Sequence, residues 1–176
     1  MSKSINIIAA VDSDFGFGKD GAIPWHYPED FKYFQKMTEG NTVIMGKATY
    51  QDLTGYFKGQ KLLPKRECIV VTSDNDLYIP YENVRPSRSV NEAIDLAKEI
   101  LQGDIFLIGG ERIFTEGLSL ADCVYLTMIP GSHECDRFFP YKKLNTTHEI
   151  HKSTEAVNTP EMRFNVYVNR VWTTNI

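Results

Sequence analysis

A carboxylate lies on the apolar face of a predicted helix near the start of the chain. The segment PEDFKYFQKMT (28–38) has helical periodicity, and Pro28 suits its first position, where the missing N–H costs nothing. Asp30 then lies on the same side as Phe31 and Phe34. Because burying an unpaired carboxylate is costly, Asp30 must be protonated or have a partner. That partner is either a structural ion pair or backbone cap, or a ligand with paired N–H donors, such as an aminopyrimidine.

Two glycine junctions follow apolar runs and have cations beside them. Gly109–Gly110 follows IFLI and precedes a predicted helix, and Gly46 precedes another helix that begins with Lys47. Glycine lets a ligand approach the backbone closely, and a helix N-terminus offers N–H groups to a phosphate. With Lys47 and Arg112 beside them, the two junctions favour a ligand with several phosphates. Each junction alone is also typical of a tight turn, and each cation of a solvated surface.

A long polar segment separates the first apolar run from the first helix. VDSDFGFGKDGAIPWHYP (11–28) holds three glycines, three aspartates and two prolines. Long loops inside compact domains are usually functional, and open α/β sheets bind ligands at the carboxyl ends of their strands. The segment is therefore interpreted as part of a site rather than as a connector.

The composition is that of a single soluble domain. The 176 residues are 42% hydrophobic and carry a net charge of −4, which gives no support for a nucleic-acid surface. Three cysteines are too few, and odd in number, for a disulfide framework, so a reducing compartment is expected. No apolar run approaches the roughly 18 residues that a membrane span needs. These features together predict a cytoplasmic protein without a membrane partner.

Short apolar runs alternate with helical patterns along most of the chain. This alternation predicts a largely parallel sheet with crossover helices. Strands are expected at 5–11, 41–46, 67–73, 104–110 and 123–129, and helices at 28–38, 47–53, 90–102 and 111–117. The tail differs, because 148–154 and 163–172 alternate apolar and polar residues as half-exposed antiparallel strands do.

Common cofactor and metal motifs are missing from the sequence. The dinucleotide fingerprint G-x-G-x-x-G and the P-loop do not occur. His133, Cys135 and Asp136 lie close together, but their spacing matches no common zinc pattern, so no metal site is expected.

The order of the motifs resembles the dihydrofolate reductase family over nearly the whole chain. INIIAAV, GAIPWHYPEDFKYFQKMT, VIMGKATYQDL, FLIGGERIF, VYLTMI and DRFFP occur in the order and with the approximate spacing of that family. The resemblance implies one α/β domain over residues 1–176, with a mixed eight-stranded, mostly parallel sheet, an antiparallel C-terminal strand and about four helices. An adenosine-binding subdomain would span about 41–103.

The resemblance also implies an enzyme. NADPH would transfer hydride to 7,8-dihydrofolate and give 5,6,7,8-tetrahydrofolate, which supports one-carbon metabolism and thymidylate synthesis. Asp30 would grip the pterin ring with support from Thr127, and Trp25 would hold an ordered water nearby. The other implied contacts around the substrate are Ile8, Phe31, Phe34, Leu53, Leu63, Ile108 and Phe114.

The cofactor residues follow from the same resemblance. Lys47, Ser73 and Arg112 match positions around the adenosine 2′-phosphate, where cations favour NADPH over NADH. Thr49 and the Gly109–Gly110 turn match the pyrophosphate cradle, and this family usually has a cis Gly–Gly bond. The remaining implied contacts are Ala10, Phe17, Gly18, Gly46, Ala48, Thr72, Arg88, Ile108, Glu111, Ile113 and Phe114.

The resemblance also implies roles for residues of two loops. Asp136 matches the acid that holds the 12–25 loop closed. Segment 54–66 is longer than in many bacterial relatives and should end in the arginine that binds the glutamate carboxylate of folate. Arg66 is assigned to that role, with Lys65 or Lys61 as alternatives.

Three other positions depart from the family pattern. Ala48 stands where some relatives have histidine near the cofactor phosphates, and Phe114 where many have tyrosine. Glu111 places an acid near the phosphates, which is unfavourable unless the side chain points away.

Two other functions were weighed against this one. The reductase of riboflavin synthesis shares the fold and NADPH but lacks the proline–tryptophan and helix-acid arrangement. A non-catalytic folate- or nucleotide-binding module would bind NADPH and methotrexate without turnover. Antifolates such as methotrexate or trimethoprim are implied ligands, and a monomer is the default expectation.

Overall fold

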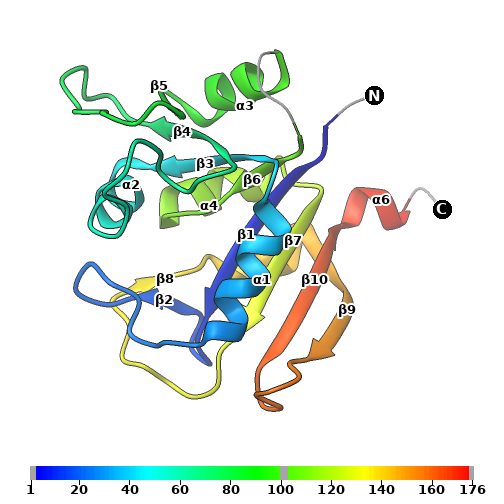
Figure 1. Cartoon of the computed structure of the whole chain (residues 1–176). Helices are drawn as coiled ribbons and strands as arrows, with labels where there is room; N and C mark the ends of the chain where they lie inside the picture. The colour runs from blue at the N-terminus through cyan, green and yellow to red at the C-terminus, as the bar shows by residue number, and fades with distance from the viewer. Residues whose placement is uncertain (1–2, 100–102, 175–176) are drawn as a thin grey trace.

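The computed structural model describes residues 3–99 and 103–174, and Figure 1 shows one twisted sheet with helices on both faces. The strand order is β5-β4-β3-β6-β1-β7-β10-β9. The strands are β1 (Ile5–Val11), β3 (Thr42–Gly46), β4 (Glu67–Val71), β5 (Val84–Ser87), β6 (Ile105–Leu107), β7 (Cys123–Met128), β9 (His148–Glu155) and β10 (Arg163–Asn169). β10 pairs antiparallel with β7 and β9, and every other neighbouring pair is parallel. The predicted mixed, mostly parallel sheet is confirmed.

Six helices and a small second sheet complete the described fold. The helices are α1 (Pro28–Thr38), α2 (Lys47–Thr54), α3 (Val90–Glu99), α4 (Glu111–Leu118), α5 (Tyr141–Thr147) and α6 (Arg170–Thr174). The second sheet pairs β2 (Gly16–Gly18) with β8 (Arg137–Phe138), and it lies at the lower left of Figure 1. The four predicted helices correspond to α1–α4, while the short α5 and α6 were not predicted. The last predicted positions of the third helix, 100–102, lie outside the described residues.

The central strands are covered on both faces. Ile7, Ile44 and Ile69 belong to one apolar cluster with residues of α3 and α4. Their neighbours Ile8 and Val43 belong to a second cluster with residues of α1 and α2. Because successive strand residues point to opposite faces, a strand buried on both faces must be apolar throughout, and this explains the uninterrupted apolar runs.

Several predicted strands end earlier than expected, for local reasons. β6 ends at Leu107 because Gly109 has a φ of 127°, which takes the backbone out of the extended region. β4 ends at Val71, and the Thr72 hydroxyl accepts the N–H of Asp74 in a turn, at 3.0 Å. These two ends deliver the residues after the strands to the same edge of the sheet.

The predicted strand over 163–172 is wrong at its C-terminal end. β10 stops at Asn169, whose Oδ1 accepts the N–H of Val171 at 2.9 Å and starts α6. β5 was not predicted because it contains Pro86. Proline is tolerated there because β5 is an edge strand.

The structure adds two facts about cysteines and membranes. Cys68, Cys123 and Cys135 are free thiols, and Cys68 is buried. Within residues 3–99 and 103–174, the helices are too short or too polar to cross a bilayer.

Gly117 tests how closely α4 packs on the sheet. A Cβ at this position would lie 2.5 Å from Leu107 Cδ1 and 3.3 Å from Ile7 Cδ1. We expect Gly117→Val to lower the free energy of unfolding by about 1–3 kcal/mol, measured by urea denaturation, because the core is overpacked. Gly59→Val is the control, since nothing lies within 4 Å of that Cβ. An unchanged midpoint for Gly117→Val would contradict the close packing.

Candidate active site

Asp30 is half-buried in the first turn of α1, where its carboxylate faces β7. The hydroxyl of Thr127, a residue only 1% exposed, donates a hydrogen bond to it. Burial raises the pKa of Asp30, and the Thr127 hydrogen bond offsets part of that rise. Within the described part of the chain, none of the ion pairs includes Asp30. The structural ion pair that the sequence left open is therefore not present.

Several predicted substrate contacts come together in one apolar cluster that includes residues of α1. The second core cluster brings together five of the predicted substrate contacts, namely Ile8, Phe34, Leu53, Leu63 and Ile108. Phe31 is different, because it is 51% exposed and its ring lies 6.1 Å from that of His26. Burial raises the pKa of Tyr33 to about 12, and the nearby charges of Tyr125 and Asp30 add to that rise.

Other predicted site residues belong to two further apolar clusters. Trp25 and Ala10 pack against the cluster formed by Ile129, Ala156 and Met162. Phe114 lies in the opposite core cluster, 2% exposed, with its ring edge-on to Phe17 at 5.4 Å. The structure therefore packs Phe114 against Phe17 in the first core cluster, whereas five of the other predicted substrate contacts belong to the second core cluster.

Arg66 is held by the C-terminal end of α1 and the preceding turn. Its Nε donates to Thr38 Oγ1 at 2.8 Å, Nη1 to Pro64 O at 2.5 Å and Nη2 to Gln35 O at 2.6 Å. Desolvation by burial lowers the pKa of Arg66. A guanidinium has five N–H donors, so one N–H remains on each Nη. A carboxylate can accept both.

Asn83 fastens the C-terminal part of the long segment 54–66, including the backbone of Arg66. This buried side chain donates to Leu62 O at 2.5 Å and to Arg66 O at 2.7 Å, and it accepts the N–H of Leu62 at 3.0 Å. Tyr81 adds a hydrogen bond to Phe57 O at 2.9 Å. The segment is thereby held against the chain that leads into β5.

The two glycine junctions meet at one edge of the sheet. Gly46 N–H donates to Gly109 O at 2.8 Å, and the Gly109–Gly110 peptide bond is cis, as expected. α2 and α4 start there, and no side chain caps either helix N-terminus. A Cβ at Gly110 would lie 3.9 Å from Thr49 Oγ1 and 4.0 Å from Phe17, where a ligand can approach the backbone. This glycine cradle with two helix N-termini fits a pyrophosphate.

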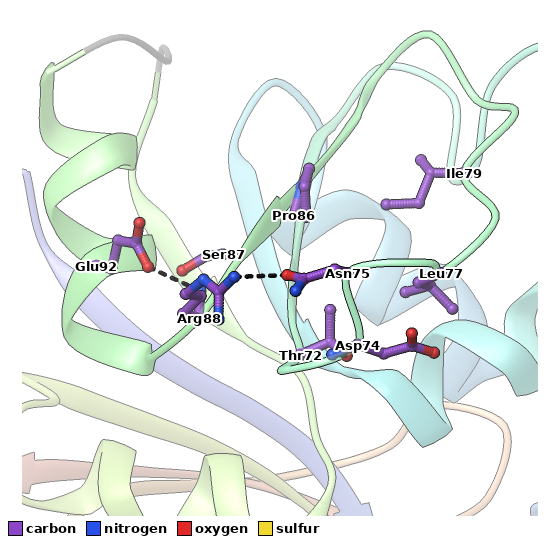
Figure 2. A pocket seen from close by; sticks show the side chains of 9 residues that line it. All are labelled: Thr72, Asp74, Asn75, Leu77, Ile79, Pro86, Ser87, Arg88 and Glu92. Atoms are coloured by element: carbon purple, nitrogen blue, oxygen red, sulfur yellow. Dashed lines mark hydrogen bonds between the residues drawn. The ribbon is translucent and has the colours of Figure 1, made fainter.

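A pocket of about 240 Å³ lies beyond this cradle, at the ends of β4 and β5 (Figure 2). Thr72, Asp74 and Arg88 line it, and Arg88 donates to Asn75 Oδ1 across its mouth. The remaining lining residues are Leu77, Ile79, Pro86, Ser87 and Glu92.

Lys47 approaches this pocket from α2. Its Nζ lies 3.0 Å from Asp74 Oδ2, and the hydrogen bond from Lys47 lowers the pKa of Asp74. The structure therefore brings together Lys47, Thr72 and Arg88 from the predicted cofactor set.

The other predicted cofactor residues do not line this pocket. Arg112 is 80% exposed and pairs with Glu116 at 3.0 Å. Ser73 is exposed and does not line the pocket. Ala48 and Glu111 are exposed, whereas Gly18 and Ile113 are buried.

Carboxylates fasten the loop that carries Phe17. Asp12, fully buried, accepts the N–H groups of Gly16 and His133, each at 2.9 Å. Burial raises its pKa, but these hydrogen bonds, with those from Asp14 and the Cys135 thiol, lower it below the ordinary value. Sequence reasoning missed Asp12, because two of its partners, His133 and Cys135, lie more than a hundred residues away.

Asp136 and Arg137 hold the same loop from β8. Asp136 accepts the N–H of Asp20 at 2.9 Å and donates its own N–H to Gly18 O at 2.9 Å, so it contacts the 12–25 loop at two points. Arg137 lies over the Phe17 ring at 5.8 Å and 3.7 Å from the carboxylate of Asp52 in α2.

The described residues contain no group of three His, Cys, Asp or Glu side chains arranged to hold a metal ion. His133 and Cys135 bond to Asp12, and Asp136 bonds to Asp20 and Gly18.

Comparison with known proteins decides the family. The family model described as dihydrofolate reductase matches residues 4–169. The chain belongs to the dihydrofolate reductase family. It is 35% identical over 136 residues to the Bacillus subtilis dihydrofolate reductase, covering 77% of this chain and 75% of that one.

Two further relatives agree. The dihydrofolate reductase HdrB of Haloferax volcanii is 34% identical over 138 residues, covering 76% of this chain and 69% of the relative. The Enterococcus faecalis dihydrofolate reductase, solved with NADP(H) and RAB-propyl, superposes with a TM-score of 0.82 at 30% identity, covering 94% of this chain and 96% of that one. The family reaction is the NADPH-dependent reduction of dihydrofolate to tetrahydrofolate, and the chain is an NADP-dependent oxidoreductase.

The raised pKa of Asp30 predicts how stability depends on pH. A folded pKa above the unfolded value means that this group favours folding below its unfolded pKa, and that the contribution is lost as pH rises through the folded pKa. Unliganded Asp30→Asn should therefore have a higher Tm than the wild type near pH 8, and the gap should close as pH falls toward about pH 4. Asp95→Asn, an exposed change on α3, is the control and should show no such trend. A gap that widens toward low pH would contradict the direction of the shift.

Proposed function

We propose that this chain reduces dihydrofolate with Asp30 as the group that binds and orients the pterin ring. The observation that carries the proposal is the half-buried carboxylate, whose hydrogen bond comes from the neutral hydroxyl of Thr127 rather than from a cation. A pterin presents two adjacent N–H donors, at N3 and the 2-amino group, and a carboxylate accepts both. When the pterin binds, its two N–H groups replace the water that Asp30 lost on burial.

The apolar cluster beside Asp30 supplies the remaining substrate contacts. Ile8, Phe34 and Ile108 exclude water from the pterin, and the exposed ring of Phe31 gives apolar area to a ligand in the cleft. The Asp30 carboxylate influences the electron distribution of the pterin ring through its hydrogen bonds. The proton at N5 of the pterin comes from a water molecule near Trp25. Precise orientation of the two reacting rings supplies much of the rate.

NADPH supplies the hydride when it is bound. We assign its pyrophosphate to Gly46, Thr49 and the Gly109–Gly110 cradle. Lys47 and Arg88 border the pocket for the adenosine end, where Thr72 also lies. The carboxamide end falls beside Ala10 and Phe17, so closure of the 12–25 loop shields the reacting atoms. The remaining members of the assigned set are Gly18, Ala48, Ser73, Ile108, Glu111, Arg112, Ile113 and Phe114.

We further propose the protein's setting and organisation. The chain forms one domain over residues 1–176, with an adenosine-binding subdomain at about 41–103, of which 100–102 lie outside the described residues. It acts as a cytoplasmic monomer on small molecules, without nucleic-acid or membrane partners. Antifolates such as methotrexate or trimethoprim bind in the pterin cleft.

The deciding experiment follows NADPH absorbance after dihydrofolate is added. We expect a loss of absorbance that methotrexate abolishes. Asp30→Asn should slow it by about 10²–10⁴-fold at neutral pH, the range for acid–base groups. Binding of NADPH and methotrexate without turnover would instead identify a non-catalytic folate-binding module, and near-normal turnover of Asp30→Asn would reject the role of Asp30.

Arg66 gives a second test, directed at the glutamate tail. Arg66→Leu should raise the KM for dihydrofolate roughly 10- to 100-fold, because a charged hydrogen-bonded contact is lost. The KM for dihydropteroate, which lacks the glutamate, should change far less. Lys65→Leu and Lys61→Leu are matched controls and should leave both constants near wild type. An effect of Lys65→Leu or Lys61→Leu larger than that of Arg66→Leu would transfer the role to that lysine.

A further inference from the structure

Glu29 stands next to Asp30 but points to a different part of the molecule. Its Oε2 accepts the N–H of Val157 at 2.7 Å, and its Oε1 accepts the N–H of Asn158 at 3.1 Å. Both donors belong to the hairpin tip, residues 156–162, that joins β9 to β10. Two successive backbone N–H groups aimed at one carboxylate form a charge-assisted pair of bonds.

The start of α1 lacks the usual local fastening. Its N-cap residue, Tyr27, makes no side-chain capping hydrogen bond, although Pro28 favours the helical conformation there. An uncapped first turn frays easily. The Glu29 bonds do not cap the N–H groups of this turn, but they hold the turn to the hairpin from outside the helix.

The hairpin tip is a firm anchor for this contact. It is closed by backbone bonds from Ala156 N–H to Met162 O and from Met162 N–H to Thr159 O, each at 2.9 Å. Ala156 and Met162 are buried against Ile129, the residue after β7. The tip is therefore fixed relative to the strand that carries Thr127.

Helical spacing divides α1 into two neighbouring faces. Glu29 and Tyr33 are four residues apart, and Tyr33 packs on Phe164 of β10 with ring centroids 4.3 Å apart. Asp30 and Phe34, also four residues apart, form the neighbouring row, in which the Asp30 carboxylate accepts the Thr127 hydroxyl and Phe34 packs in the second core cluster. The face with Glu29 thus holds the helix to the hairpin, while the face with Asp30 meets the substrate.

We infer that Glu29 is a positioning residue, which fixes the first turn of α1 on the 156–162 hairpin so that Asp30 meets the pterin donors. Sequence periodicity alone places Glu29 with the solvated side chains of the helix, so this role emerges only from the fold. The inference rests on the proposed function, because it assumes that Asp30 binds the pterin.

The test compares the binding of substrate and cofactor. Among the described residues, no hydrogen bond or ion pair joins the hairpin tip to α2 or α4, where the cofactor cradle lies. Glu29→Ala should raise the Kd for dihydrofolate about tenfold, as expected for a small misplacement of a binding group. It should lower kcat as well. The Kd for NADPH should stay within about twofold of the wild-type value, a change within the usual effect of a surface substitution. Glu29→Gln keeps one acceptor oxygen and should recover most of the loss. Glu161→Ala removes an exposed carboxylate from the same hairpin and is the matched control.

Two results would overturn the inference. One is an unchanged dihydrofolate Kd in Glu29→Ala. The other is a parallel loss of NADPH and dihydrofolate binding with a lowered Tm and no recovery in Glu29→Gln, which would make the contact purely structural. A wild-type chain that binds both ligands without turnover would reject the proposed function. The changes in the Kd values for dihydrofolate and NADPH between the wild type and Glu29→Ala would still decide the role of Glu29.

Discussion

The burial of one carboxylate beside an apolar cluster constrains the rest of this molecule. Asp30 loses water when α1 packs on the sheet, and this loss raises its pKa. Thr127 returns one hydrogen bond but no positive charge. A cation in its place would stabilise the unliganded chain more, yet it would occupy the position that a ligand's N–H donors need. The apolar packing around the cleft must therefore carry the free-energy cost of keeping Asp30 available.

The position of Asp30 depends in turn on how α1 is held. The helix has no side-chain cap at its start, so its orientation comes from contacts along its length. Tyr33 against Phe164 and the Arg66 hydrogen bonds to Thr38 and Gln35 hold its middle and its end. The same Arg66 that faces the proposed glutamate site also closes the C-terminal end of the helix. Substrate recognition and helix placement thus share side chains.

The two ends of the cleft use different kinds of attachment. The glycine junctions are joined by a backbone hydrogen bond between Gly46 and Gly109, and they lie at the ends of β3 and β6, which are buried on both faces. The loop with Phe17 is held by side chains, of which Asp12 is buried and bonded several times. The Arg137–Asp52 pair, at 3.7 Å and partly exposed, contributes at most about 1 kcal/mol. A cradle joined through the sheet and a loop held by separate side-chain contacts suit a site that must admit and release two ligands.

Local patterns in the sequence determined much of this protein. Uninterrupted apolar runs predicted the central strands, because a strand covered on both faces cannot alternate. The helical spacing of 28–38 placed Asp30 on the apolar side, and the glycines predicted both junctions and the cis Gly109–Gly110 bond through the family resemblance. Where a local signal was weak or ambiguous, the prediction failed. β5 contains a proline, and α6 begins where one asparagine side chain, that of Asn169, turns an alternating strand.

Only the tertiary structure decided which polar groups meet. Glu29 bonds to backbone N–H groups 128 and 129 residues away, and Asp12 to one 121 residues away. Arg137 reaches Asp52 across the cleft. Periodicity shows which face of an element is apolar, because side chains at fixed spacings along the chain share a face. It does not show which carboxylate finds which donor, because that depends on the order of strands in the sheet and on where the loops return.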